Sequence, residues 1–210
     1  MNTPKFIISI LSLTWLLLPG TVNAQHKFDS KQIHLTVDWQ MNAPFSTDFT
    51  DKISGWGANI ELHYQWTPRW ETGLFVSYHS NHDYVDRSTI SLSPTETITT
   101  DQLRSAFQVP FGLSARYLMG NNKHLQPYAG AKLGVMFARN TTYYGTGGLY
   151  DKGYGAYVSP EIGLRFYPGA DQRWGFHIAG YYSYATNKTT TLTHEIKGQN
   201  NAGFRLGLIF

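Results

Sequence analysis

Apolar and polar residues alternate along eight segments of the chain, which is the pattern of β-strands with two different faces. The segments cover residues 33–41, 56–66, 70–79, 107–117, 129–137, 158–166, 174–182 and 203–210. In the first of them, Leu35 and Val37 share one face, whereas His34 and Thr36 share the other. The chain is therefore predicted to be all-β, with an even number of strands.

The connections between these segments are alternately short and long. The short ones contain Pro or Gly, which favour tight turns, and cover residues 67–69, 120–125 and 168–173. The long polar ones are predicted to be loops and lie near residues 43–54, 80–102, 140–153 and 186–199. Short turns on one side and long extracellular loops on the other are typical of transmembrane β-barrels.

The outward face of this barrel can be inferred from its aromatic residues. Aromatic side chains lie near segment ends on the apolar face, at Trp39, Trp56, Trp66, Trp70, Tyr117, Phe166 and Trp174. Such a girdle marks the two membrane boundaries, and most segments are long enough to cross a bilayer when tilted. A soluble barrel with its apolar face turned inward around a ligand is the alternative. We predict an eight-stranded antiparallel up-and-down transmembrane β-barrel.

The N-terminus has the layout of a secretory signal. Lys5 precedes the apolar run Phe6–Leu18, and the small residues Val22 and Ala24 occupy the positions that a signal peptidase reads. We predict a signal peptide over residues 1–24 and one outer-membrane barrel domain over residues 25–210. A retained N-terminal anchor is the alternative reading of the apolar run.

Composition narrows the class of protein further. Aromatic residues make up 15% of the chain, and mean hydropathy is −0.32. After the leader, no apolar run approaches the length of a membrane-spanning helix. The chain has no cysteine, so no disulfide framework holds it, and a net charge of +3 is too small to suggest a nucleic-acid partner.

Three stretches carry a family resemblance. Gly203–Phe210 alternates and closes on an aromatic residue, so it resembles the last strand of bacterial outer-membrane proteins. Val109–Tyr117 and Gln126–Gly134 resemble the central hairpin of the small eight-stranded outer-membrane β-barrel family common in Bacteroidota. The resemblance implies a location in outer-membrane lipid and recognition of Phe210 by the barrel-assembly machinery as an assembly signal.

The polar face of the segments holds nine charged residues of nearly balanced sign: Asp38, Glu61, Glu71, Arg104, Arg116, Lys132, Glu161, Arg165 and Arg205. In a narrow barrel of low dielectric constant, unpaired charges are costly, so these groups are predicted to interlock as ion pairs. The resulting network would be a structural plug. A narrow ion path along the same residues is the alternative.

Other candidate chemistry is weaker. His79 and Ser80 loosely resemble the His and Ser of outer-membrane lipid A deacylases. In those enzymes the His and Ser are two residues apart and share a face of the strand. His79 and Ser80 are adjacent, so they are expected to point to opposite faces. His79, His82 and Asp83 lack a diagnostic metal-ligand spacing. We predict no catalytic residue, metal site or cofactor. Pro110 and Pro160 interrupt predicted strands, and bulges or local kinks are expected there.

The leading functional hypothesis is a non-enzymatic outer-membrane barrel that serves envelope structure or surface interaction. Its long loops could contact an extracellular partner, because residues 140–157 are rich in Tyr, which makes good contact surfaces. The alternatives are a narrow pore for small solutes or ions and a lipid-modifying enzyme.

Overall fold

The computed structural model describes residues 32–45, 49–93, 95–120, 122–145, 147–169, 173–191 and 194–210, with the side chains of residues 92 and 93 excepted. The predicted signal peptide, residues 1–24, lies outside this part of the chain. The described part of the chain forms the strands β1 (Ile33–Phe45), β2 (Gly57–Gln65), β3 (Trp70–Ser93), β4 (Glu96–Leu118), β5 (Leu125–Tyr144), β6 (Gly147–Phe166), β7 (Gly175–Thr191) and β8 (His194–Ile209).

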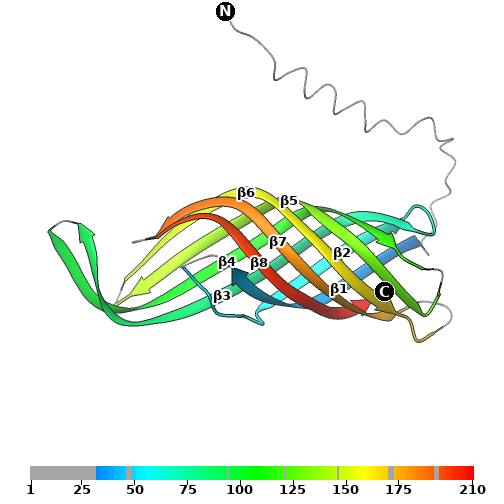
Figure 1. Cartoon of the computed structure of the whole chain (residues 1–210), viewed down its shortest axis with the longest axis horizontal. Coiled ribbons are helices and arrows are strands. Elements are labelled where there is room, and N and C mark those ends of the chain that lie inside the picture. Colours follow the sequence, from blue (N-terminus) through cyan, green and yellow to red (C-terminus); the bar gives the residue numbers. More distant parts are fainter. Residues whose placement is uncertain are drawn as a thin grey trace, which may run out of the picture. The chain divides into compact units, whose positions relative to one another are not determined.

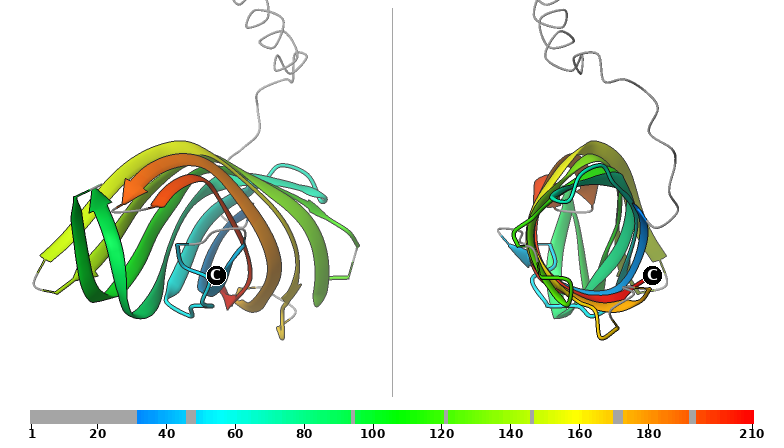
Figure 2. Two further views of the ribbon diagram at one scale, coloured as in Figure 1. Left: turned by 60° about the vertical axis from the view of Figure 1, so that its left-hand side comes forward. Right: turned by 90° about the vertical axis from the view of Figure 1, so that its right-hand side faces the viewer.

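The eight strands form one closed antiparallel barrel in which each strand pairs with the next and β8 pairs with β1 (Figure 1). Figure 2 shows the ring along its axis. Leu35 and Phe210 seal the seam with two main-chain hydrogen bonds of 2.9 and 2.8 Å. Among the described residues, no helix is long and apolar enough to cross a membrane. The predicted up-and-down topology is confirmed.

Apolar side chains cover the outside of the barrel and polar side chains fill the inside. Leu74, Leu113 and Leu133 stand outward on three neighbouring strands, with exposed fractions of 60, 65 and 61%. In contrast, Glu61 and Lys132 are fully buried in the interior. This arrangement suits a lipid environment outside the barrel. The alternative of an apolar cavity inside a soluble barrel is therefore wrong.

Two levels of outward aromatic residues bound the apolar zone. Trp70 and Tyr117 pack at 5.1 Å between ring centroids near the short turns. Farther along the strands, an outer aromatic belt contains Tyr78, Phe107, Phe137 and Tyr154, which pack in pairs at 5.8 and 5.2 Å. The eight residue-to-residue steps from Trp70 to Tyr78, tilted by about 40°, span roughly 20 Å of membrane height. The outer belt therefore marks the extracellular boundary of the membrane.

Three of the four predicted loops are largely β-hairpin. The predicted loop 80–102 lies in β3 and β4, which remain paired as far as Ser93 and Glu96. The predicted loops 140–153 and 186–199 lie mostly in β5–β6 and β7–β8. The loop prediction is wrong here because a strand that is polar on both faces shows no alternation of apolar and polar residues. The β-branched Thr residues of these segments do favour strand formation. The β3–β4 hairpin projects past the other strands at this end of the barrel (Figure 1).

The connection between β1 and β2 folds into the extracellular mouth of the barrel. Phe49 is buried against Ala106 and Ile196. The Lys52 ammonium lies 2.7 Å from the Asp83 carboxylate, and this hydrogen bond raises the pKa of Lys52 above its ordinary value. The loop is thereby held against β3.

The predicted bulges at Pro110 and Pro160 are absent. On both sides of Pro110, β3 and β4 keep one register, from Val76↔Phe111 to His79↔Gln108. The same is true of β6 and β7 around Pro160. Each proline interrupts the ladder without shifting it. Next to Pro160, the Ser159 hydroxyl donates a 2.8 Å hydrogen bond to the Tyr182 carbonyl, which offsets the missing N–H donor.

Candidate functional site

Among the described residues, eight buried carboxylate, ammonium and guanidinium side chains from seven strands lie in the barrel interior. They are buried, with at most 4% exposed, and comprise Asp38 (β1), Glu61 (β2), Glu71 (β3), Arg116 (β4), Lys132 (β5), Glu161 and Arg165 (β6) and Arg205 (β8). Strand alternation turns each of them inward. Four acids thus face four bases, all of them among the nine residues singled out in the sequence.

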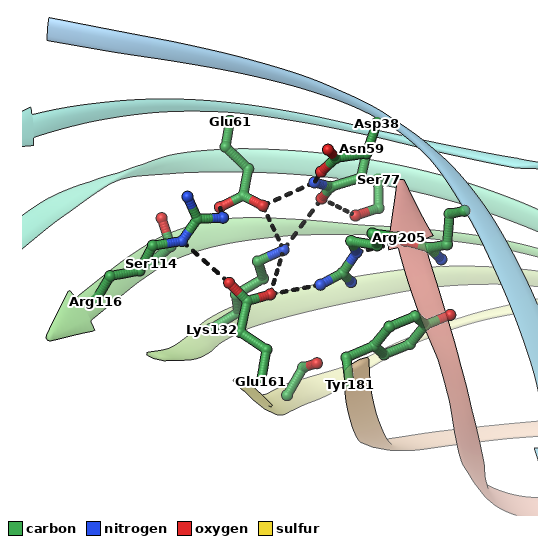
Figure 3. Close-up of polar contacts among 12 residues, drawn as sticks. Asp38, Asn59, Glu61, Ser77, Ser114, Arg116, Lys132, Glu161, Tyr181 and Arg205 are labelled. Carbon is green, nitrogen blue, oxygen red and sulfur yellow. Dashed lines mark hydrogen bonds and ion pairs between the residues drawn. The ribbon is translucent and has the colours of Figure 1, made fainter. Parts of the chain in front are cut away.

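A central cluster is built on two carboxylates and three bases (Figure 3). Arg116 lies 2.8 Å from Glu61 through Nη2 and donates a 3.1 Å bond to Glu161 through Nε. Lys132 bridges the same two carboxylates at 2.7 and 3.1 Å. Arg205 adds a 2.5 Å contact to Glu161. Because two bases are shared, the two acids are held as one unit.

A second ion pair lies nearer to the short turns. Arg165 and Glu71 form a two-pronged pair, with Nη1 donating to Oε1 at 2.7 Å and Nη2 donating to Oε2. His34 lies 3.9 Å from the same carboxylate. Bidentate geometry of this kind is among the strongest that a carboxylate can make.

A hydrogen-bonded chain joins the fourth acid to the central cluster. The Asp38 carboxylate lies 2.6 Å from Nδ1 of His177, whose Nε2 lies 2.7 Å from the Tyr128 hydroxyl. That hydroxyl donates to Glu161 at 3.1 Å. Asn59 donates both to Asp38, at 2.8 Å, and to Glu61, at 2.7 Å. Asp38, His177, Tyr128 and Asn59 therefore belong to one hydrogen-bonded network with the central cluster.

Above the charged network, toward the extracellular end, lies a layer of neutral amides and imidazole. His79 contacts Gln40 at 3.1 Å and Gln108 at 2.7 Å. Asn42 donates to Asn81 at 2.8 Å and to Asn201 at 3.1 Å. This layer continues the hydrogen bonding across the lumen without adding charge.

Arg104, the ninth charged residue from the sequence, lies apart from the central cluster. It is half-buried on β4 beyond the outer aromatic belt, and its guanidinium lies 6.0 Å from the centre of the Phe49 ring. The reason is the length of β4, since Arg104 belongs to the hairpin that the sequence pattern did not reveal.

In the described part of the chain, large buried side chains occupy the interior, among them Arg116, Arg165, Arg205 and Tyr128. At the extracellular mouth, a cavity of about 10 Å³ is lined by Phe49, Asn140 and Gln199 among others, which is room for about one water. The larger hollows, of 510 and 520 Å³, open on the outer face near Leu113 and Ile162. A barrel of eight strands is expected to be filled by its own side chains.

Several interior residues were not among the sequence candidates. His177, His63 and Asn59 lie on the polar faces of the predicted segments. They were not among the nine candidates because those candidates share a formal charge, which these three side chains lack. His63 lies 3.4 Å from Glu61 and 2.8 Å from the Ser114 hydroxyl. Inward parity combined with polarity would have found all three. Tyr128 precedes the predicted fifth segment by one residue and was outside its pattern.

In the His79 region, the structure brings together Ser80 and His82 instead of His79 and Ser80. His79 is buried inside the barrel, whereas Ser80 and His82 lie on the other face of β3 with 3.2 Å between Oγ and Nε2. No carboxylate in the described part of the chain orients His82 through a hydrogen bond. Likewise, no group of three or more potential metal ligands occurs among the described residues.

Comparison with known proteins identifies the family. A family model described as the outer membrane protein beta-barrel domain matches residues 14–210. The chain belongs to this family. Membership implies location in an outer membrane. No curated protein matches the chain.

Three solved structures are similar in fold. Neisserial surface protein A is 13% identical, with 85% of this chain and 96% of that chain covered and a TM-score of 0.49. The β-barrel domain of Pseudomonas aeruginosa OprF is 18% identical, with 85% and 98% covered and a TM-score of 0.42. Ail, the attachment invasion locus protein of Yersinia pestis, is 14% identical, with 85% and 96% covered and a TM-score of 0.41.

Proposed function

We propose that the chain is a non-enzymatic outer-membrane barrel with a closed lumen, which serves envelope structure or surface contact through its extracellular hairpins. The observation that supports closure is the interior network, in which three acids pair with four bases across the lumen and the fourth acid, Asp38, bonds to His177. Paired charges of balanced sign offset much of their desolvation cost, whereas an ion path would need charges that remain accessible to water.

Planar-bilayer recording of the purified, folded protein tests closure. The wild-type protein is expected to show no steady conductance. A variant carrying Lys132→Ala, Glu161→Ala and Arg205→Ala empties the middle of the lumen and is expected to conduct, provided that its gel mobility still shifts on boiling. Steady conductance from the wild-type protein would contradict the proposal and favour the narrow pore.

The extracellular hairpins support a role in contact with other polypeptides. In the described residues, β2 pairs with β3 as far as Gly57↔His79, whereas β3 continues to Ser93. A strand edge without a neighbour offers main-chain groups for strand addition. Tyr84, Leu103 and Tyr143 stand outward and exposed at paired positions of β3, β4 and β5.

A trimmed hairpin tests this contact role. Val85 and Gln102 are paired, so an Asn-Gly turn can join them in place of residues 86–101. Cells that display the wild-type protein are expected to settle faster than cells that display the trimmed protein at equal abundance. Equal settling rates would count against contact between neighbouring cells.

We also infer that the aromatic ring of Phe210 is the signal for the barrel-assembly machinery. Phe210→Ala keeps the two main-chain bonds to Leu35, so the seam itself is preserved. Phe204, another outward aromatic residue of β8, supplies the matched control as Phe204→Ala. Folded protein in the membrane fraction is expected to fall several-fold for Phe210→Ala alone. If both variants lost folded protein to the same extent, Phe210 would contribute only as a lipid-facing side chain and not as an assembly signal.

A further inference from the structure

A row of exposed basic side chains crosses the outer face of β5 to β8. It consists of Arg139, Lys152, Lys188 and Lys197, one from each strand, and is called the basic row below. Arg139 pairs with Lys152, and Lys188 pairs with Lys197.

The two halves of the basic row are joined by contacts between β6 and β7. The backbone N–H of Thr190 donates to the Asp151 carboxylate at 2.8 Å, and that of Ala156 donates to the Thr186 hydroxyl at 2.9 Å. These bonds flank Lys152 on β6 and Lys188 on β7. The basic row is therefore continuous around this side of the barrel.

The basic row lies directly above the outer aromatic belt. Phe137 and Tyr154 of that belt are paired, and Arg139 and Lys152 follow two residues farther out on the same strands. Two residues correspond to about 7 Å along a strand. Aromatic belts lie at the level of lipid headgroups, and long basic side chains can extend along that boundary. The basic row is thus at the depth of the outer-leaflet headgroups.

The basic row keeps a positive net charge, although two acids, Glu195 and Asp151, lie beside it. Lys197 lies 2.9 Å from Glu195, so its charge is already paired. The Asp151 carboxylate accepts two backbone N–H bonds, from Lys152 and Thr190. The Arg139 guanidinium stacks on Tyr150, 4.6 Å from the ring centre. Arg139, Lys152 and Lys188 therefore present three cations to the same surface.

The opposite side of the barrel has the reverse charge. Above the belt, the β3–β4 hairpin exposes the acids Asp86, Glu96 and Asp101 beside the exposed base Arg87, so its charge is negative. A one-sided basic surface at headgroup depth is complementary to an anionic lipid. We propose that Arg139, Lys152 and Lys188 bind the phosphate groups of an outer-leaflet glycolipid, with Lys197 at the margin. This lipid site goes beyond the proposed contact role, and its test does not depend on that role.

Native mass spectrometry of the folded protein in detergent, titrated with bisphosphorylated lipid A, tests the proposal. The variant Arg139→Gln/Lys152→Gln/Lys188→Gln is compared with Arg69→Gln/Lys123→Gln/Arg173→Gln, which removes three bases at the short turns. Heat-modifiable gel mobility verifies folding of both. The first variant is expected to bind lipid A about 10-fold or more weakly, the second to bind like the wild-type protein, and inorganic phosphate to leave lipid A binding unchanged.

Three results would overturn the proposal. Wild-type affinity in the first variant would show that the basic row does not hold the headgroup. Equal weakening in both variants would reduce the effect to net charge. Displacement of lipid A by inorganic phosphate would indicate a free-anion site instead of a lipid site.

Discussion

Replacing Glu161 by Gln should destabilise the barrel strongly. Glu161 receives bonds from Arg116, Lys132, Arg205 and the Tyr128 hydroxyl. The amide keeps the volume but removes the charge and turns an NH₂ group toward donors, leaving three acids against four bases in the interior. Removal of one partner from a buried ion pair costs about 3–5 kcal/mol. With an m-value of about 2 kcal/mol per M, the urea midpoint falls by roughly 2 M.

The assay is urea unfolding of the protein in phospholipid vesicles, followed by tryptophan fluorescence and gel mobility without boiling. Glu195→Gln is the control, because Glu195 and Lys197 form an ion pair with side chains 58 and 65% exposed, worth at most about 1 kcal/mol. The double variant Glu161→Gln/Arg205→Gln restores equal charge and should recover part of the loss. Equal midpoints for Glu161→Gln and Glu195→Gln would refute the reasoning.

Three further results are expected. In the same urea assay, Gly163→Ala should lower the unfolding free energy by about 1–3 kcal/mol, because a Cβ there would lie 2.5 Å from the Tyr128 ring. Gly180→Ala should be neutral, because a Cβ at that position would meet nothing within 4 Å. Equal effects of the two substitutions would contradict this prediction. Removal of residues 86–101 should change the unfolding free energy by no more than about 1 kcal/mol, because this part of the hairpin lies beyond the membrane. A larger fall would show that the hairpin supports the barrel. Lipid A from cells overexpressing the protein should keep its acyl number, and a change abolished by His82→Ala would instead establish an enzyme.

The membrane-spanning part of the fold could be predicted from the sequence because lipid outside and polar groups inside impose strict alternation. Glu71 and Leu74 already reveal which face is which, whereas Phe75 is an apolar exception on the inward face and packs with Met136 and Tyr157. The extracellular hairpins could not be predicted in this way. Around Thr89 and Thr99, both faces meet water, and pairing depends on the backbone and on contacts such as the 2.8 Å bond between these two hydroxyls.

The interior residues were predictable as a set but not as pairs. Parity places Glu61 and Glu161 inside, yet the pairing of Glu71 with Arg165 depends on barrel shear, which brings together residues 94 positions apart in the chain. The role of His177 between Asp38 and Tyr128 depends on the same geometry. Local sequence carries no signal for such long-range contacts.

Thiol labelling tests the closed interior most directly, because the chain has no cysteine of its own. Ser183 is buried in the lumen and Ser88 is exposed on the extracellular hairpin. Ser183→Cys and Ser88→Cys would be treated, in folded protein in vesicles, with a small charged methanethiosulfonate reagent. The account predicts fast labelling at position 88 and none at position 183 until the protein is unfolded. Labelling at both positions at similar rates would contradict a closed lumen.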